Sequence, residues 1–282
     1  MDRLLRDIAP LSERGWGEIE SEARRTLRAN LAARRLVDFT GPKGWDFSAV
    51  DSAQGVPNPL AMEGGVRANV RRVQPLMELR RTFDVPRTTI DAIDRGARNA
   101  DLDMVVEAAQ AVALAEDRLV FYGDQTASIL GICTGAAEAA LPIREKYEDN
   151  PALVATALSK LRESGVDGPF ALALGKRCYT GLTETTKEGY PVLQHVQRLI
   201  TGPIVWAPAV NGAVVLSMRG DDFELIVGQD LSIGYLSHDN AKVTLYLEES
   251  LTVRLLSPQA AVPLEYREAR ERRSARGAEE KP

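Results

Sequence analysis

Histidine, the side chain that most often transfers protons in enzymes, occurs only twice in this sequence of 282 residues. His195 lies beside Leu193 and Val196, a pattern typical of a partly exposed helix residue. His238 stands in the segment Ser237-His238-Asp239-Asn240, which predicts a turn, and adjacent turn residues seldom form a Ser/His/Asp triad. Two histidines also cannot build a multi-histidine metal centre within one chain.

Four carboxylates could do acid–base or metal chemistry, but each has a simpler interpretation. Asp101 and Asp103 begin a predicted long helix, where acidic groups favour the positive end of the helix dipole. Glu116 and Asp117 lie inside that helix, and for Asp117 a buried ion pair with an arginine is favoured over a catalytic acid. The motifs GxxxxGK[ST], GxGxxG after a strand and HExxH are absent from the sequence. We therefore expect no catalytic residue, no metal and no enzyme activity.

Composition and charge exclude further classes of protein. The net charge is −5 with both signs interspersed, unlike the basic stripe of a nucleic-acid binder. The first seven residues include four charged side chains and lack an apolar signal core, and no apolar run approaches the ~20 residues that span a bilayer. Cys133 and Cys178 are expected to be reduced packing residues. We expect a cytoplasmic protein that binds neither nucleic acid nor membrane.

The segment 10–35 is predicted to form an amphipathic helix. Its apolar residues recur every three or four positions and form one stripe, namely Trp16, Ile19, Ala23, Leu27 and Leu31. Such a stripe has to cover another surface. By contrast, glycine and proline interrupt every pattern between residues 44 and 73. That stretch predicts a long loop or extended hairpin that reaches towards a partner.

The remaining periodicities predict an alternation of helices and strands. Thr88 is the expected N-cap of a short helix, with Asp91 in a capping-box position and Gly96 as its end. Residues after 266 have no large apolar side chain and are expected to be solvated. The other predicted helices cover 101–122, 151–164, 176–185 and 192–200, and the predicted strands cover 36–39, 75–83, 170–174, 204–207, 213–217, 224–228, 233–237 and 242–256.

The order of several short motifs resembles the encapsulins, the shell proteins of bacterial nanocompartments, over residues 2–264. Most specific is the segment 219–225, Arg-Gly-Asp-Asp-Phe-Glu-Leu, followed by residues 228–235, Gly-Gln-Asp-Leu-Ser-Ile-Gly-Tyr. Other matching stretches are Asp7-Ile8-Ala9-Pro10-Leu11, Arg34-Arg35-Leu36-Val37-Asp38, Gly165-Val166-Asp167-Gly168-Pro169, Gly189-Tyr190-Pro191 and Trp206-Ala207-Pro208-Ala209.

This resemblance implies an α+β protein with the tailed-phage major capsid protein fold, made of a peripheral domain, an axial domain and an extended arm. The long helix 101–122 would be the spine of the peripheral domain. The implied division is the N-terminal helix and start of the peripheral domain at 1–43, the arm at 44–74, the peripheral domain at 75–130, the axial domain at 131–215, the C-terminal part of the peripheral domain at 216–264, and a charged tail at 265–282.

The resemblance also implies two functional surfaces. In encapsulins the first helix lines the shell interior and forms a groove that binds the C-terminal targeting peptide of a cargo enzyme. The matching residues here are Leu27, Leu31, Arg34, Asp38, Leu231, Ile233 and Tyr235. The turn near the fivefold pore would comprise Thr185, Thr186, Lys187, Glu188, Gly189 and Tyr190. Core packing is the alternative for the two helix leucines, and an ion pair with Asp38 is the alternative for Arg34.

Some relatives bind a flavin on an aromatic residue in the segment corresponding to 84–96, but this chain has no Trp or Tyr there. We therefore expect no cofactor. The implied function is self-assembly into an icosahedral shell that encloses a dye-decolorising peroxidase or a ferritin-like protein, in oxidative-stress defence or iron storage. A phage or prophage capsid protein that packages DNA and an enzyme with a novel site are the alternatives.

Overall fold

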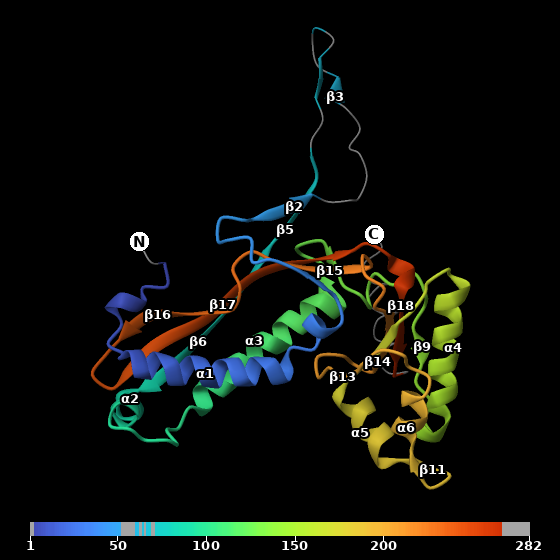
Figure 1. The fold of residues 1–282 in the computed structure, drawn as a ribbon. Coiled ribbons are helices and arrows are strands. Elements are labelled where there is room, and N and C mark those ends of the chain that lie inside the picture. Colours follow the sequence, from blue (N-terminus) through green and yellow to red (C-terminus); the bar gives the residue numbers. More distant parts are fainter. Residues whose placement is uncertain (1–2, 52–59, 62–63, 65, 69–70, 267–282) are drawn as a thin grey trace.

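Two five-stranded sheets organise the chain, and an arm of paired short strands projects from the first of them (Figure 1). The computed structural model describes residues 3–51, 60–61, 64, 66–68 and 71–266. The first sheet lies among the N-terminal helices, and the second lies among the helices of the middle of the chain (Figure 1). This mixture of helix and sheet agrees with the predicted α+β class.

The first sheet is built around one long strand, β17. Along one edge β17 pairs antiparallel with β6, from Lys242 opposite Pro86 to Leu251 opposite Met77. Along its other edge it pairs first with β16 and then with β15, and β1 adds to β15 in parallel. The strands are β1 (Asp38–Thr40), β6 (Met77–Pro86), β15 (Phe223–Val227), β16 (Ser232–His238) and β17 (Lys242–Leu255). In the described residues β16 pairs with no strand other than β17, so its other edge has no strand beside it, although the N–H of Tyr235 on that edge donates to the carbonyl of Leu4.

Three helices accompany this sheet, namely α1 (Glu13–Asn30), α2 (Arg87–Asp94) and α3 (Asp103–Tyr122). The side-chain oxygen of Ser12 accepts the N–H of Gly15 at 3.0 Å and caps α1. The apolar stripe of α1 is buried, as its periodicity predicted: Ile19 is fully buried and packs in one cluster with Val112 of α3 and Leu245 of β17. Among the described helices, none combines the length and the apolar content that a membrane span requires.

The second sheet has the order β13-β10-β14-β18-β9. Every residue of the central strands β10 and β14 is buried, so both faces of the sheet are covered. Its strands are β9 (Leu141–Pro142), β10 (Phe170–Leu174), β13 (Ile204–Trp206), β14 (Ala213–Ser217) and β18 (Ala261–Glu265). Helices α4 (Asn150–Glu163), α5 (Lys176–Glu184) and α6 (Val192–Gln197) surround it, and the short hairpin of β11 (Thr186–Lys187) and β12 (Tyr190–Pro191) lies at its far end (Figure 1).

The arm consists of two strand pairs, β2 with β5 and β3 with β4, and it extends away from both sheets (Figure 1). Their bounds are β2 (Ala49–Asp51), β3 (Leu60–Ala61), β4 (Arg67–Ala68) and β5 (Val73–Pro75). The predicted extended hairpin is confirmed at these positions, while the rest of segment 44–73 lies partly outside the described residues. A further small hairpin joins β7 (Gly123–Asp124) to β8 (Ile129–Leu130), and single 3-10 turns occupy η1 (Arg6–Ile8), η2 (Ala33–Arg35), η4 (Tyr147–Asp149) and η5 (Pro258–Ala260).

Three local predictions differ from the structure. The N-terminal helix ends at Asn30, not Arg35, and a separate turn follows it. Thr88 is not an N-cap: α2 starts at Arg87, directly after Pro86 ends β6, and it has no side-chain cap. The segment 216–264 was expected to return wholly to the peripheral half, but its last strand, β18, pairs with β14 of the second sheet. The turn at η5 carries the chain back from the first sheet to the second.

Candidate functional site

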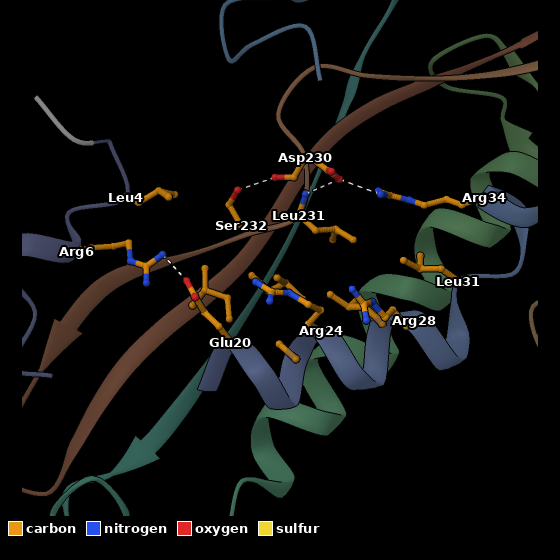
Figure 2. A pocket seen from close by; sticks show the side chains of 14 residues that line it. Leu4, Arg6, Glu20, Arg24, Arg28, Leu31, Arg34, Asp230, Leu231 and Ser232 are labelled. Carbon is orange, nitrogen blue, oxygen red and sulfur yellow. Dashed lines mark hydrogen bonds and ion pairs between the residues drawn. The ribbon is translucent and has the colours of Figure 1, made fainter. Parts of the chain in front are cut away.

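A groove of about 410 Å³ lies between α1 and the segment that leads into β16 (Figure 2). Its walls come from three parts of the chain: the N-terminal segment, one face of α1 with the following turn, and residues 230–233. Its lining residues are Leu4, Arg6, Glu20, Ala23, Arg24, Leu27, Arg28, Leu31, Arg34, Asp230, Leu231, Ser232, Ile233 and Leu247.

The floor of the groove is apolar. Leu27 and Leu31 are four residues apart, which places them one above the other on the same face of the chain. Leu231 and Ile233 face them from the other wall. Leu27 and Ile233 are only 8% and 6% exposed, so their side chains also belong to the core beneath the groove. The two interpretations of Leu27, core packing and groove lining, therefore both apply.

Arg34 connects the groove to the buried interior. Its Nε donates to both carboxylate oxygens of Glu116 on α3, at 2.9 and 3.0 Å. Its two terminal nitrogens donate to Asp230 at 2.9 Å and to Glu249 of β17 at 2.5 Å. Burial alone would lower the pKa of the guanidinium, but the carboxylates around it raise that pKa overall. Arg34 is therefore a fixed cation, and its partners are Glu116, Asp230 and Glu249, not Asp38.

Glu116 and Glu249 are both fully buried at the side chain, so the cluster places three carboxylates around one guanidinium. Burial, and then the charge of Glu116, raise the pKa of Glu249 well above its ordinary value. The cluster fixes the turn after α1 against α3 and β17. That turn carries the wall of the groove formed by Leu31 and Arg34.

Asp117 was expected to pair with an arginine, and this expectation is wrong. Its carboxylate accepts the backbone N–H of Ala32 at 3.0 and 3.1 Å and that of Ala33 at 2.8 Å. Burial raises the pKa of Asp117 to about 7, although these N–H groups act in the opposite direction. The adjacent Glu116 receives the arginine instead, because α3 directs these two neighbouring side chains to different parts of the turn.

Two predicted groove residues do not line the groove. Asp38 lies at the start of β1, where its carboxylate accepts the N–H of Asp221 at 2.7 Å. The hydroxyl of Tyr235 lies 2.5 Å from Nδ1 of His238, which is the last residue of β16 and not part of a turn. The backbone N–H of Tyr235 donates to the carbonyl of Leu4 at 2.8 Å. Tyr235 therefore holds the N-terminal segment beside β16.

The sequence prediction missed more than half of the residues that line the groove. Glu20, Arg24 and Arg28 follow the same helical spacing as Leu27 and Leu31, so the periodicity of α1 could have identified them. Leu4 and Arg6 carry no such signal, because they reach the groove only by tertiary packing. Arg6 forms an ion pair with Glu20 at 2.5 Å and its guanidinium lies 4.2 Å above the ring of Trp16.

The residues predicted for the pore lie together at the β11–β12 hairpin, at the opposite end of the second sheet from the arm (Figure 1). Glu188 and Gly189 form its tip with positive φ angles of 54° and 81°. Tyr190 is 56% exposed. Lys187 donates to the carbonyl of Glu148 at 3.3 Å, and Nε2 of the partly exposed His195 lies 3.3 Å from the carbonyl of Lys187.

The remaining residues that could do chemistry lie in surroundings typical of structural residues. Cys133 and Cys178 are buried free thiols, and burial raises the pKa of Cys178 to about 12. Within the described ranges, no group of three or more His, Cys, Asp or Glu side chains is arranged to hold a metal ion. Asp101 accepts the N–H of Asp103 at 3.1 Å at the start of α3, in line with its predicted place at the helix terminus.

Comparison with known proteins gives the family. Residues 1–252 match the model of a family described as "Encapsulating protein for peroxidase". The chain belongs to the encapsulin family. It is 52% identical over 270 residues to the type 1 encapsulin shell protein of Rhodospirillum rubrum, with 94% of this chain and 96% of that protein covered. It is 42% identical over 266 residues to the type 1 encapsulin shell protein of Mycobacterium tuberculosis, covering 94% and 100% of the two chains.

Solved structures agree on the fold of this encapsulin. The virus-like particle of Pyrococcus furiosus aligns with a TM-score of 0.61 at 20% identity, over 89% of this chain and 99% of that chain. The capsid of the Myoviridae phage XM1 aligns with a TM-score of 0.53 at 11% identity, over 81% and 89%. The predicted tailed-phage capsid fold is thereby confirmed. The relatives are named as shell proteins and not as enzymes.

Proposed function

We propose that the encapsulin self-assembles in the cytoplasm into a closed icosahedral shell that encloses a peroxidase, and that its own role is structural and not catalytic. The family description names a peroxidase as the enclosed protein, and this supports that cargo over a ferritin-like one. The capsid-like fold supports the shell, because copies of such a chain close by repeated heterologous contacts. The family match disfavours a DNA-packaging capsid.

The groove is the proposed docking site for the cargo. The observation that carries this proposal is the combination of an apolar floor, a charged rim and the open edge of β16 in one place. Such a site suits an extended peptide, since the strand edge offers backbone hydrogen bonds and the floor accepts alternate side chains. Leu27, Leu31, Leu231 and Ile233 would contact aliphatic side chains of the C-terminal targeting peptide, and Arg34 would border it.

The β11–β12 hairpin is the proposed edge of a pore. Its exposed tip and its lack of core residues support a position where several copies meet. The pore would pass small substrates of the enclosed enzyme and select them by size and charge. Lys187 and Glu188 are the charged residues of that tip.

Expression of the chain alone tests the shell. Spherical particles of megadalton mass in size-exclusion chromatography and negative-stain microscopy are expected, and a free chain of 30.8 kDa or a dimer contradicts the proposal. Co-expression with a peroxidase encoded beside the gene tests the cargo. The intact peroxidase should sediment with the shells, and the same enzyme without its C-terminal segment should not. A ferritin-like neighbour tested in the same way would reveal the second cargo class.

A further inference from the structure

The charges of the groove are unevenly matched. Among its lining residues, Arg6 is paired with Glu20, and Arg34 is paired with Asp230 and with the buried Glu116 and Glu249. Arg24 and Arg28 are exposed, line the groove, and have no acidic partner or hydrogen bond among the described residues. Figure 2 shows both arginines on the α1 wall, across from Leu231 and Ser232.

These two arginines also repel each other. They are four residues apart on one helix face, where like charges destabilise a helix. Glu20 lies on the same face, four residues before Arg24, but it is paired with Arg6. The neighbouring Arg25, which does not line the groove, is paired with Glu22 at 2.6 Å. Arg24 and Arg28 thus place positive charge without an acidic partner among the described residues on the groove side of α1.

The open edge of β16 gives the direction of a bound chain. Residues Ser232 to Tyr235 pair in register with Glu248 to Leu245 of β17. The N–H of Tyr235 points away from β17, since it donates to Leu4. Residues two apart on an antiparallel strand direct their backbone groups to the same side, so the N–H and C=O of Ile233 point away from β17, at the edge where Tyr235 meets Leu4. No described residue pairs with these two groups, which continue the edge that Leu4 already occupies.

A segment added to this edge would turn every second side chain towards the floor and α1, because successive strand residues point to opposite faces. Two residues of strand advance about 6.6 Å, and the step of four positions from Arg24 to Arg28 advances about 6 Å along the helix. The spacing of alternate peptide side chains is therefore close to the spacing of the two arginines along α1. When one aliphatic side chain of the peptide fills the floor, the side chain two positions away lies on the same face and is directed towards these arginines.

We infer that the groove selects an extended peptide that carries an acidic side chain on the same face as its aliphatic side chains, held by Arg24 and Arg28. This inference rests on the proposed docking function of the groove and specifies the chemistry of its ligand. Arg24 and Arg28 act as specificity-determining residues, whereas Leu27, Leu31, Leu231 and Ile233 supply the apolar contact.

A pool of random C-terminal tails tests the inference without assuming a tail sequence. A fluorescent protein with a randomised tail of ten residues is co-expressed with the full chain, shells are sedimented, and retained tails are identified by mass spectrometry. Wild-type shells should enrich tails with Asp or Glu at an even spacing from Leu, Ile or Val. Shells of the Arg24→Gln/Arg28→Gln variant should lose the acidic preference and keep the aliphatic one, and the Arg25→Gln control should behave as wild type.

Single tails then measure the size of the preference for an acidic side chain. One enriched tail with Asp and the same tail with Asn should differ by about threefold to tenfold in retention on wild-type shells, and the difference should shrink in 0.5 M salt. Enrichment of aliphatic tails without an acidic preference, or an acidic preference that survives in the double variant, overturns the inference and leaves the docking function standing. If Leu31→Asp shells retain the same tails as wild type, the docking function itself is wrong.

Discussion

Nε of Arg34 lies 2.9 and 3.0 Å from the two carboxylate oxygens of Glu116, although these residues are separated by 82 positions in the chain. The pair joins the turn after α1 to the buried face of α3. Because Arg34 also contacts Asp230 at 2.9 Å, the same guanidinium connects both walls of the groove to the core. The shape of the groove therefore depends on a buried ionic cluster and not on apolar packing alone.

Replacement of Arg34 by methionine should destabilise the fold. The variant leaves Glu116 and Glu249 buried without their cation, and the loss of one partner of a buried ion pair costs about 3–5 kcal/mol of unfolding free energy. Urea denaturation followed by tryptophan fluorescence should show a lower midpoint. A second change, Glu116→Gln, should restore part of the loss, and Arg25→Met, at a side chain that is 77% exposed, is the control. Equal midpoints for Arg34→Met and the wild type would contradict this role.

An aspartate at position 31 should abolish cargo loading while shells still form. Leu31 is only partly buried and faces the groove, so a carboxylate there removes apolar contact without opening the core. The amount of tagged cargo that sediments with the particles is the measurement, and electron microscopy checks assembly. Leu114→Asp, a change at an exposed leucine of α3 outside the groove, is the matched control. Wild-type loading by Leu31→Asp would place the docking site elsewhere.

How far the sequence predicts this structure depends on the range of the interactions. The regular elements follow from local patterns: α3 and the strands β10 and β14 have bounds within two residues of those predicted. The stripe of α1 predicted its buried face for the same reason. The end of α1 was missed because helical periodicity in the sequence continues through Leu31 and Arg34. In the structure, the carboxylate of Asp117 accepts the N–H groups of Ala32 and Ala33 and so fixes the backbone there in a separate turn.

The residues of the groove divide in the same way, into those that the sequence predicts and those that depend on long-range contacts. Leu27, Leu31, Arg34, Leu231 and Ile233 were predicted from the resemblance to encapsulins, and the structure brings them together. The partners of Arg34 could not be predicted, because they come from positions 116, 230 and 249 and meet only after the sheet has formed. Nor does any pattern in the first eight residues of the sequence indicate that the carbonyl of Leu4 pairs with β16.

The pH dependence of the unfolding free energy should reveal the raised pKa of Asp117. A carboxyl group whose folded pKa is raised binds its proton more tightly in the folded state than in the unfolded one. Its contribution to stability is therefore present below its ordinary pKa near 3.8 and is lost as pH rises to about 7. Asp117→Asn keeps an oxygen that can accept the N–H groups of Ala32 and Ala33 but removes the titration.

Relative to the wild type, the Asp117→Asn variant should gain stability between pH 4 and pH 7, by at most about 1.4 kcal/mol per pH unit, and the difference should be constant above pH 7. Urea denaturation at several pH values measures this slope. Asp101→Asn, at the exposed start of α3, is the control for loss of one carboxylate. A difference that does not change between pH 4 and pH 7 would show that Asp117 titrates normally.

Reversal of the charge at Lys187 should change which small substrates reach an enclosed peroxidase. Lys187 is exposed at the tip of the β11–β12 hairpin, and its ammonium group is held near the tip by the carbonyl of Glu148. Lys187 and Glu188 place both charge signs at the tip, and Lys187→Glu leaves only negative charge there. The variant should therefore lower the turnover of an anionic reducing dye and raise that of a cationic dye of similar size. The effect should weaken as salt concentration rises, because the charges are exposed to solvent.

The free peroxidase is the control, since its preference between the two dyes cannot depend on the shell. An unchanged ratio of turnover for the two dyes in Lys187→Glu shells would show that substrates enter by another route.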